Sequence, residues 1–251
     1  MITDNARYPD PKRSIPPRVR LDGERKHKGW DLDALAIEGN EGGRHLAWLP
    51  SLPANAPIDL IRKVYERDGV VHLRGLLPRK EVLDVRRRFF EYVQHTGVLK
   101  EGTLPEEGIY SGIYGELDGE DPLAEYRTGA NYERFVRDFV AHPLIADMAA
   151  RIKCEWKQPW AFRQQVLRTN LPHSRRTATR VHYDQMYLRG MEPDALTAWI
   201  PIGDISPVGG GLMYLEDSVP LGTEIENLFK KLNANLPEEA QLDAFNENVA
   251  A

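Results

Sequence analysis

The second half of the chain consists of short apolar runs separated by glycine and proline, and this pattern restricts the folds open to it. The runs lie at residues 160–169, 181–187, 196–202 and 212–215. Most are shorter than a typical helix, and turn-forming residues, such as the three glycines at 209–211, separate them. Short strands bounded in this way are typical of an antiparallel sandwich or barrel.

The residues before this block repeat their apolar side chains at helical spacing. Four helices are predicted in this way, at residues 60–68, 78–93, 131–139 and 144–152. Gly69 is expected to end the first helix, a short strand to follow at 70–73, and Asn131 to cap the third helix. Helices segregated from an antiparallel sheet predict an α+β architecture.

The chain therefore divides into four predicted parts. Residues 1–55 are rich in proline and basic side chains and predict an extended N-terminal arm. Residues 56–155 form a mainly helical layer, residues 156–222 supply the strands of the barrel, and residues 223–251 return to helical composition on either side of a proline. Together residues 56–251 are predicted to form one domain.

Charge and cysteine content exclude several classes of partner. The chain has 33 Lys and Arg against 38 Asp and Glu, a net charge of −5, which argues against a nucleic-acid partner. With Cys154 as its one cysteine, it can form neither an intramolecular disulfide nor a cysteine-rich zinc site. No secretory leader and no run of about 18 apolar residues is present, so we expect a cytoplasmic protein that does not contact membranes.

One short motif in the predicted barrel could carry chemistry. His182 and Asp184 are two residues apart, so on a strand their side chains project to the same side. One imidazole and one carboxylate on one face are two of the three ligands of the 2-His-1-carboxylate triad that binds Fe(II) in oxygenases. A His–Asp hydrogen bond on a strand without metal is the alternative interpretation of the same motif.

Three segments in order carry a resemblance to a known family: the helix end and strand at 65–77, the motif at 182–184, and the strand, turn and strand at 196–218. On these residues the chain resembles the phytanoyl-CoA dioxygenase family of Fe(II)/2-oxoglutarate oxygenases over about residues 58–222. The resemblance implies a double-stranded β-helix, or cupin-like jelly roll, flanked by N-terminal helices. It also implies Fe(II), 2-oxoglutarate as cosubstrate, and a small organic substrate such as an acyl-CoA or a specialised metabolite, which is hydroxylated or desaturated.

The resemblance also implies roles for individual residues. His182 and Asp184 match the metal motif and are the candidate catalytic residues, while Gln164, Arg168 and Trp199 are candidates for cofactor binding. Residues 156–183 contain six basic side chains and no Asp or Glu. Such a local positive field favours an anionic cosubstrate, although a solvated basic loop would have the same composition.

The chain departs from the family pattern after this motif. The family has a second metal-binding histidine and, about ten residues later, an arginine that holds 2-oxoglutarate, whereas no histidine follows His182 and no arginine follows Arg189. We therefore expect a C-terminally truncated member whose barrel is incomplete and whose activity is in doubt. The alternatives are a third ligand from His173, Glu216 or a partner chain, and a catalytically inactive jelly-roll binding protein. Unpaired barrel edges would favour a homodimer.

Overall fold

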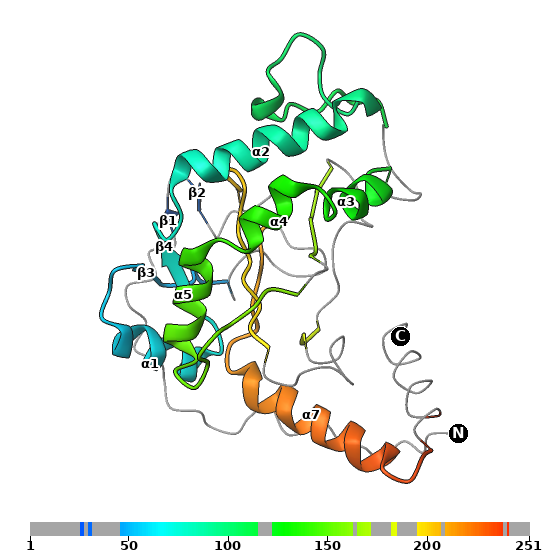
Figure 1. Cartoon of the computed structure of the whole chain (residues 1–251). Helices are drawn as coiled ribbons and strands as arrows, with labels where there is room; N and C mark the ends of the chain where they lie inside the picture. Colours follow the sequence, from blue (N-terminus) through cyan, green and yellow to red (C-terminus); the bar gives the residue numbers. More distant parts are fainter. Residues whose placement is uncertain are drawn as a thin grey trace.

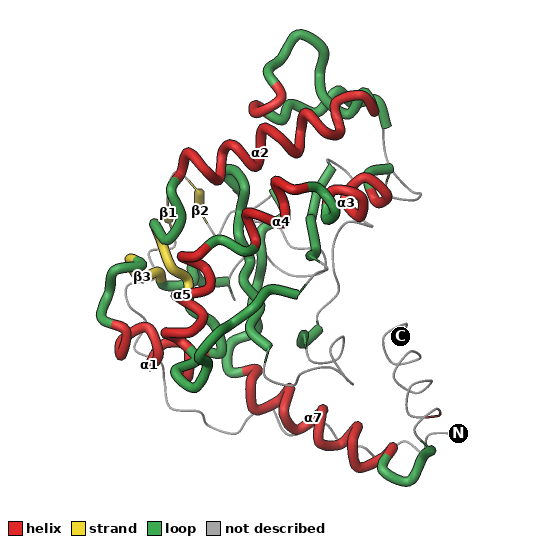
Figure 2. The backbone as a smooth tube through the Cα atoms, viewed as in Figure 1, coloured by secondary structure: helices red, strands yellow, loops and turns green. Residues whose placement is uncertain are grey.

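The computed structural model describes residues 26–27, 30–31, 46–114, 122–162, 165–171, 182–184, 195–206, 209–237 and 240. Among the regular elements of these residues, helices outnumber strands (Figure 2). The α-helices are α1 (Ile58–Asp68), α2 (Arg79–Val93), α3 (Ala124–Ala130), α4 (Arg134–Val140), α5 (Pro143–Ile152) and α7 (Ser218–Asn233). The 3-10 helices are η3 (Gln94–Thr96) and η4 (Pro105–Glu107). The strands β1 (Lys26–His27) and β2 (Trp30–Asp31) pair antiparallel, and β3 (Ser51–Pro53) pairs parallel with β4 (His72–Arg74).

The first predicted helix and strand are confirmed as α1 and β4. Gly69 follows α1 with a left-handed φ of 69°, and its N–H donates to the carbonyl of Tyr65, so the helix ends at the predicted glycine. The partner of β4 is β3, in which Ser51 lies opposite His72. Because β3 lies within the residues expected to form the arm, the sheet of the helical layer begins before residue 56.

The helices predicted at 78–93 and 144–152 are confirmed as α2 and α5. The helix predicted at 131–139 is present as α4, but its N-cap is Glu133 and not Asn131. The side chain of Asn131 instead donates from Nδ2 to the carbonyl of Gln165 at 2.9 Å. The residue thus joins the helical layer to a later segment of the chain.

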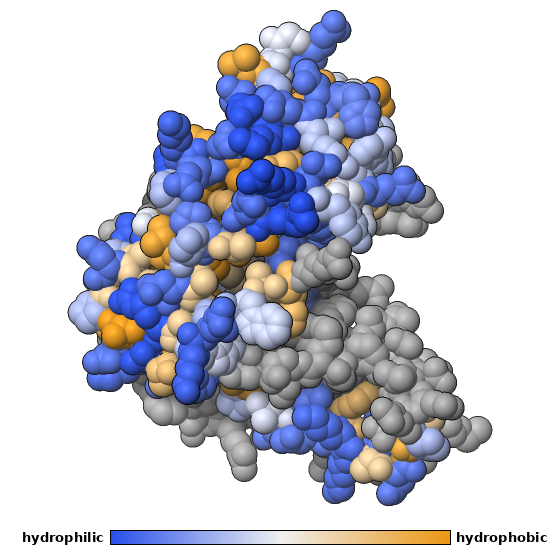
Figure 3. All heavy atoms as spheres, in the orientation of Figure 1, coloured by the Kyte–Doolittle hydropathy of each residue, from blue (hydrophilic) through white to orange (hydrophobic). Residues whose placement is uncertain are grey.

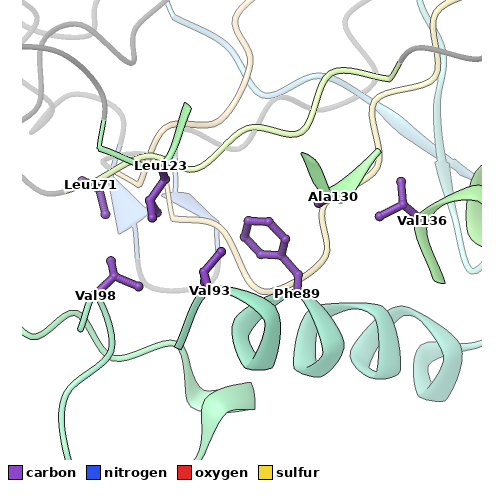
Figure 4. Close-up of a cluster of buried hydrophobic side chains, with 7 residues drawn as sticks. All are labelled: Phe89, Val93, Val98, Leu123, Ala130, Val136 and Leu171. Carbon is purple, nitrogen blue, oxygen red and sulfur yellow. The ribbon is translucent and has the colours of Figure 1, made fainter. Parts of the chain in front are cut away.

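The larger core forms where α2, α3 and α4 meet (Figure 4). Phe89 and Val93 project from α2 towards Val98 and Leu123, and the later residue Leu171 packs against the same cluster. The amphipathic stripe of α2 therefore supplies the buried face predicted from its apolar spacing.

A second core lies between α1, α5 and the β3–β4 pair. Its buried members are Ala56, Ile61 and Met148. Arg62 on α1 also donates from Nε to the carbonyl of Arg151 on α5 at 2.7 Å. Because Gly69 follows α1 directly, this core fixes the end of α1 against which α7 later packs.

The expected double-stranded β-helix is not confirmed. Among the described residues of the four predicted strands, none pairs into a sheet. Residues 165–171 alternate between exposed and more buried side chains, a period of two that is typical of extended chain. Figure 1 shows residues 195–206 running towards α2 and residues 209–217 returning to α7, with a side chain–backbone bond from Asn170 Nδ2 to the carbonyl of Gly210 at 3.0 Å.

The predicted C-terminal helix is confirmed as α7, but it begins at Ser218, within the residues expected to form strands. It lies at the opposite end of the molecule from α2 (Figure 1). The second helical segment predicted after Pro237 lies almost wholly outside the described residues. None of the described helices is long and apolar enough to cross a membrane.

Candidate metal centre

The two residues of the predicted metal motif lie side by side. His182 Nε2 and Asp184 Oδ1 are 3.6 Å apart, and both side chains are partly exposed. Two donors that each bind one first-row metal ion at about 2.1 Å can be no more than about 4.2 Å apart. At 3.6 Å the imidazole and the carboxylate lie within this limit, so both can reach a single ion. The same distance also fits an ion pair between the two side chains without a metal, so both interpretations of the motif stay open.

The other oxygen of Asp184 is occupied by a neighbouring segment. The hydroxyl of Thr197 donates to Asp184 Oδ2. Such a bond fixes the carboxylate plane and leaves Oδ1 directed at His182. Hydrogen bonds of this kind orient the ligands of metal sites and tune their basicity. Residues 196–202, expected to form a strand, thus contribute to the site through Thr197.

Tyr183, between the two candidate ligands, contacts α7. Its hydroxyl donates to Glu226 Oε2 at 3.1 Å. The Tyr183 ring also packs over Gly222, which lies one helical turn before Glu226 on α7. A Cβ at Gly222 would lie 3.8 Å from Tyr183 Cγ. Gly222 and Glu226, four residues apart on α7, therefore both contact Tyr183. These contacts hold the motif against α7.

Glu226 is an unusual residue for this position because it is only 7% exposed. A buried carboxylate is costly unless it is paired and hydrogen-bonded. The Tyr183 hydroxyl supplies one partner, and Lys230 Nζ lies 4.0 Å from Glu226 Oε1, one turn further along the helix. The arrangement converts a buried charge into a fixed anchor for the segment that carries His182 and Asp184.

Tyr214, in the third segment of the expected family pattern, is influenced by the charge of Asp184. Burial raises the pKa of the Tyr214 hydroxyl, and the negative charge of Asp184 raises it further. A phenol held neutral beside a carboxylate can donate a hydrogen bond without adding charge. Tyr214 therefore belongs to the surroundings of the candidate centre.

The structure shows no hydrogen bond or ion pair between the candidate centre and the three residues expected to bind the cosubstrate, as far as these are described. Gln164 lies outside the described residues. Arg168 is on the exposed side of residues 165–171, and Trp199 is partly exposed two residues after Thr197. Of the six basic residues between 156 and 183, Lys157 and Arg168 are described and both are exposed. The roles of these residues stay predictions.

The described residues supply two candidate metal ligands at this centre. No group of three His, Cys, Asp or Glu side chains suited to hold a metal occurs among them. Of the alternative third ligands, His173 lies outside the described residues, and Glu216 is exposed at the start of the turn before α7. The donor set that is present, one imidazole and one carboxylate, matches part of a ferrous triad.

Sequence reasoning missed two residues of this site. Thr197 was noted only as part of an apolar run, and Glu226 only as part of a helical tail. The spacing of Gly222 and Glu226 by one helical turn indicates a face of α7 on which another side chain can pack. Nothing in the sequence identifies Tyr183, 43 residues away, as that side chain.

Comparison with known families matches one family model to the chain. The model is described as Phytanoyl-CoA dioxygenase (PhyH), and it covers residues 65–222, more than half of the chain. The match includes His182, Asp184 and Thr197 and ends at Gly222, under Tyr183. No curated protein and no solved structure gives a significant match.

Proposed function

The chain belongs to the phytanoyl-CoA dioxygenase family, whose members are generally 2-oxoglutarate-dependent oxygenases, and on this premise we propose that it oxidises a small organic substrate with Fe(II) bound by His182 and Asp184. The observation that carries the proposal is the 3.6 Å approach of His182 Nε2 to Asp184 Oδ1. A single ion fits between these atoms, and the family match covers both residues.

The residues around the pair have separate tasks in this proposal. Thr197 fixes the plane of the Asp184 carboxylate, and the Tyr183–Glu226 bond holds the backbone between the two ligands in place. Tyr214 stays neutral at physiological pH and offers a proton donor near Asp184. When bound, Fe(II) supplies the oxidising chemistry with 2-oxoglutarate and dioxygen, while the protein supplies position and exclusion of water.

The cosubstrate site and the third ligand complete the proposal. Gln164, Arg168 and Trp199 hold 2-oxoglutarate, and the guanidinium of Arg168 is suited to pair with a carboxylate. The third ligand comes from His173, Glu216 or a partner chain. An acyl-CoA and a specialised metabolite remain the two substrate classes, with hydroxylation or desaturation as the outcome, in the cytoplasm.

The proposal is tested by succinate formation from 2-oxoglutarate under air with added Fe(II). We expect iron-dependent turnover that falls at least ~100-fold in His182→Ala and in Asp184→Asn, because each variant removes one of the ligands. The matched control is Glu81→Gln, which removes the carboxylate of another His–carboxylate pair, with His142 Nε2 and Glu81 Oε2 3.0 Å apart. Its turnover should equal that of the wild type.

The alternative function, a catalytically inactive jelly-roll binding protein, predicts a different result. It requires no turnover in the wild type and the same Fe(II) affinity in the wild type and His182→Ala. Iron binding that depends on His182 without turnover would support the metal site but contradict the oxygenase. Absence of both iron binding and turnover would contradict the whole proposal.

A further inference from the structure

Helix α7 has a second face that the candidate metal centre does not use. The first face carries Gly222 and Glu226, which seat Tyr183. The second face carries Leu221, Ile225, Leu228 and Leu232, at spacings of four, three and four residues. Residues at this spacing form one continuous stripe on a helix. The two faces point in different directions, since Glu226 is separated from the stripe by more than a quarter turn.

The stripe becomes more exposed towards the end of the helix. Leu221 and Ile225 are half-buried, whereas Leu228 is 45% and Leu232 is 71% exposed. In Figure 3 the surface around the end of α7 shows hydrophobic side chains among hydrophilic ones. An alternating four-and-three spacing is the a/d pattern by which two helices interlock side chains. The stripe therefore has the spacing at which the side chains of a second helix can interlock with it.

The charges beside the stripe specify its partner. Glu224 and Lys231 are exposed and occupy equivalent flanking positions, one heptad apart on the same side of the stripe. When two copies of this helix pair antiparallel, Leu221 faces Leu232 and Ile225 faces Leu228 of the other copy. In the same register Glu224 faces Lys231, and the two-fold axis repeats the pair. A parallel pairing would lack these contacts, because residues at this flanking position do not meet in it.

We propose that α7 pairs antiparallel with α7 of a second copy of this chain, through the Leu221–Leu232 stripe and two Glu224–Lys231 ion pairs. The interface is isologous, as expected for a two-fold dimer. Two heptads bury less than the roughly 800 Å² per partner of a standard stable interface, so we expect a weak dimer that is tested at micromolar concentrations. The surface is distinct from the barrel edges and does not rest on the proposed function.

Sedimentation equilibrium of the full chain from about 5 to 200 μM tests the pairing. The wild type should dimerise, and Leu228→Asp/Leu232→Asp should be monomeric throughout. Glu224→Lys alone and Lys231→Glu alone should each weaken the dimer about tenfold, because like charges then meet twice. An equimolar mixture of these two variants should regain wild-type affinity as a heterodimer, since every pair again joins opposite charges.

Asn227→Lys is the matched control, because it changes the charge of α7 at an exposed position away from the stripe. It should leave the dimer unchanged. A monomeric wild type would overturn the proposal and leave the stripe to a different protein or to another part of the chain. A dimer that survives the aspartate variants, or a mixture that does not regain affinity, would also overturn it.

Discussion

The helical layer at residues 46–152 and the residues that follow it use their large apolar side chains in opposite ways. In the helical layer Phe89 is 4% exposed and Ile61 is fully buried, and their helices enclose two cores. In the later half Trp160 is 93% exposed, and the side chains of residues 212–215 are each exposed over at least half of their surface. The first region is stabilised by side-chain packing, whereas the second, apart from Leu171 in the larger core, is held mainly by polar contacts such as Tyr183–Glu226.

This difference shows what each region contributes. Burial of apolar area stabilises a domain without fixing the position of any one atom. A hydrogen bond between two particular atoms adds little net stability but specifies geometry. The helical layer therefore acts as the scaffold, and the later half, which carries His182 and Asp184, depends on a few contacts to α7 and to the scaffold for its shape.

Truncation of one aromatic ring in each region should give the largest difference in stability between the two regions. Phe89→Ala removes a ring from the larger core and should lower the free energy of unfolding by about 3–5 kcal/mol. The matched variant Phe162→Ala truncates a half-exposed ring in the later half and should cost less than about 1 kcal/mol. Urea denaturation measures both values. Equal losses would contradict the division into a packed scaffold and a loosely packed half.

The contact between the two regions at Gly69 should give the next largest effect. Gly69→Ala forces a side chain into a left-handed backbone, and its Cβ would collide with Val219 at the start of α7. The two effects together should cost about 2–4 kcal/mol in thermal or urea unfolding. Gly69→Ala/Val219→Ala removes the collision and should recover the share of the lost stability that the collision causes. A double variant no more stable than Gly69→Ala would show that α7 does not pack on the end of α1.

Loss of one polar contact in the later half should have a smaller effect on stability and a larger one on the site. Tyr183→Phe removes the hydroxyl that donates to the buried Glu226 carboxylate and should cost about 1–3 kcal/mol. It should also weaken Fe(II) binding, because the motif loses its anchor. Tyr132→Phe, at an exposed tyrosine of the helical layer, is the control and should change neither quantity. Unchanged iron affinity in Tyr183→Phe would mean that α7 does not position the ligands.

The smallest effect is expected at a surface ion-pair cluster of the helical layer. Hydrogen bonds from Arg87 and Arg88 hold the pKa of the Asp84 carboxyl below its ordinary value. A carboxyl with a lowered pKa stabilises the fold above its unfolded-state pKa and loses that contribution as the pH falls through its folded-state pKa. Asp84→Asn should therefore lower stability at pH 7 by at most about 1 kcal/mol and flatten the acid limb of the pH profile. An unchanged acid limb would contradict this.

The sequence predicts the scaffold well because its signals are local. The spacing of Val85, Phe89 and Val93 places one face of α2 in the core, and a glycine ends α1 where a left-handed residue is needed. Strand pairing is not local, so short apolar runs such as 212–215 predict extended chain without identifying a partner. The described residues of these runs form no strands, and the sequence could not show this because it does not identify pairing partners.

The candidate site divides along the same line. His182 and Asp184 lie two residues apart and approach to 3.6 Å, although residues 182–184 do not form the strand from which their common side was predicted. Thr197 and Glu226 reach the motif from 13 and 43 residues away, and no periodicity reveals such contacts. The tertiary arrangement of α7, which begins five residues before the predicted helical tail, brings Glu226 under Tyr183.

The measurement that tests the central claim most directly is anaerobic titration of the full chain with Fe(II) in the presence of 2-oxoglutarate, followed by the absorption band of the iron–2-oxoglutarate chelate. The account predicts a band that saturates at one iron per chain, is lost in Asp184→Asn, and is retained in Glu81→Gln. A wild type without the band, or a band of equal strength in Asp184→Asn, would contradict the assignment of His182 and Asp184 as an iron site.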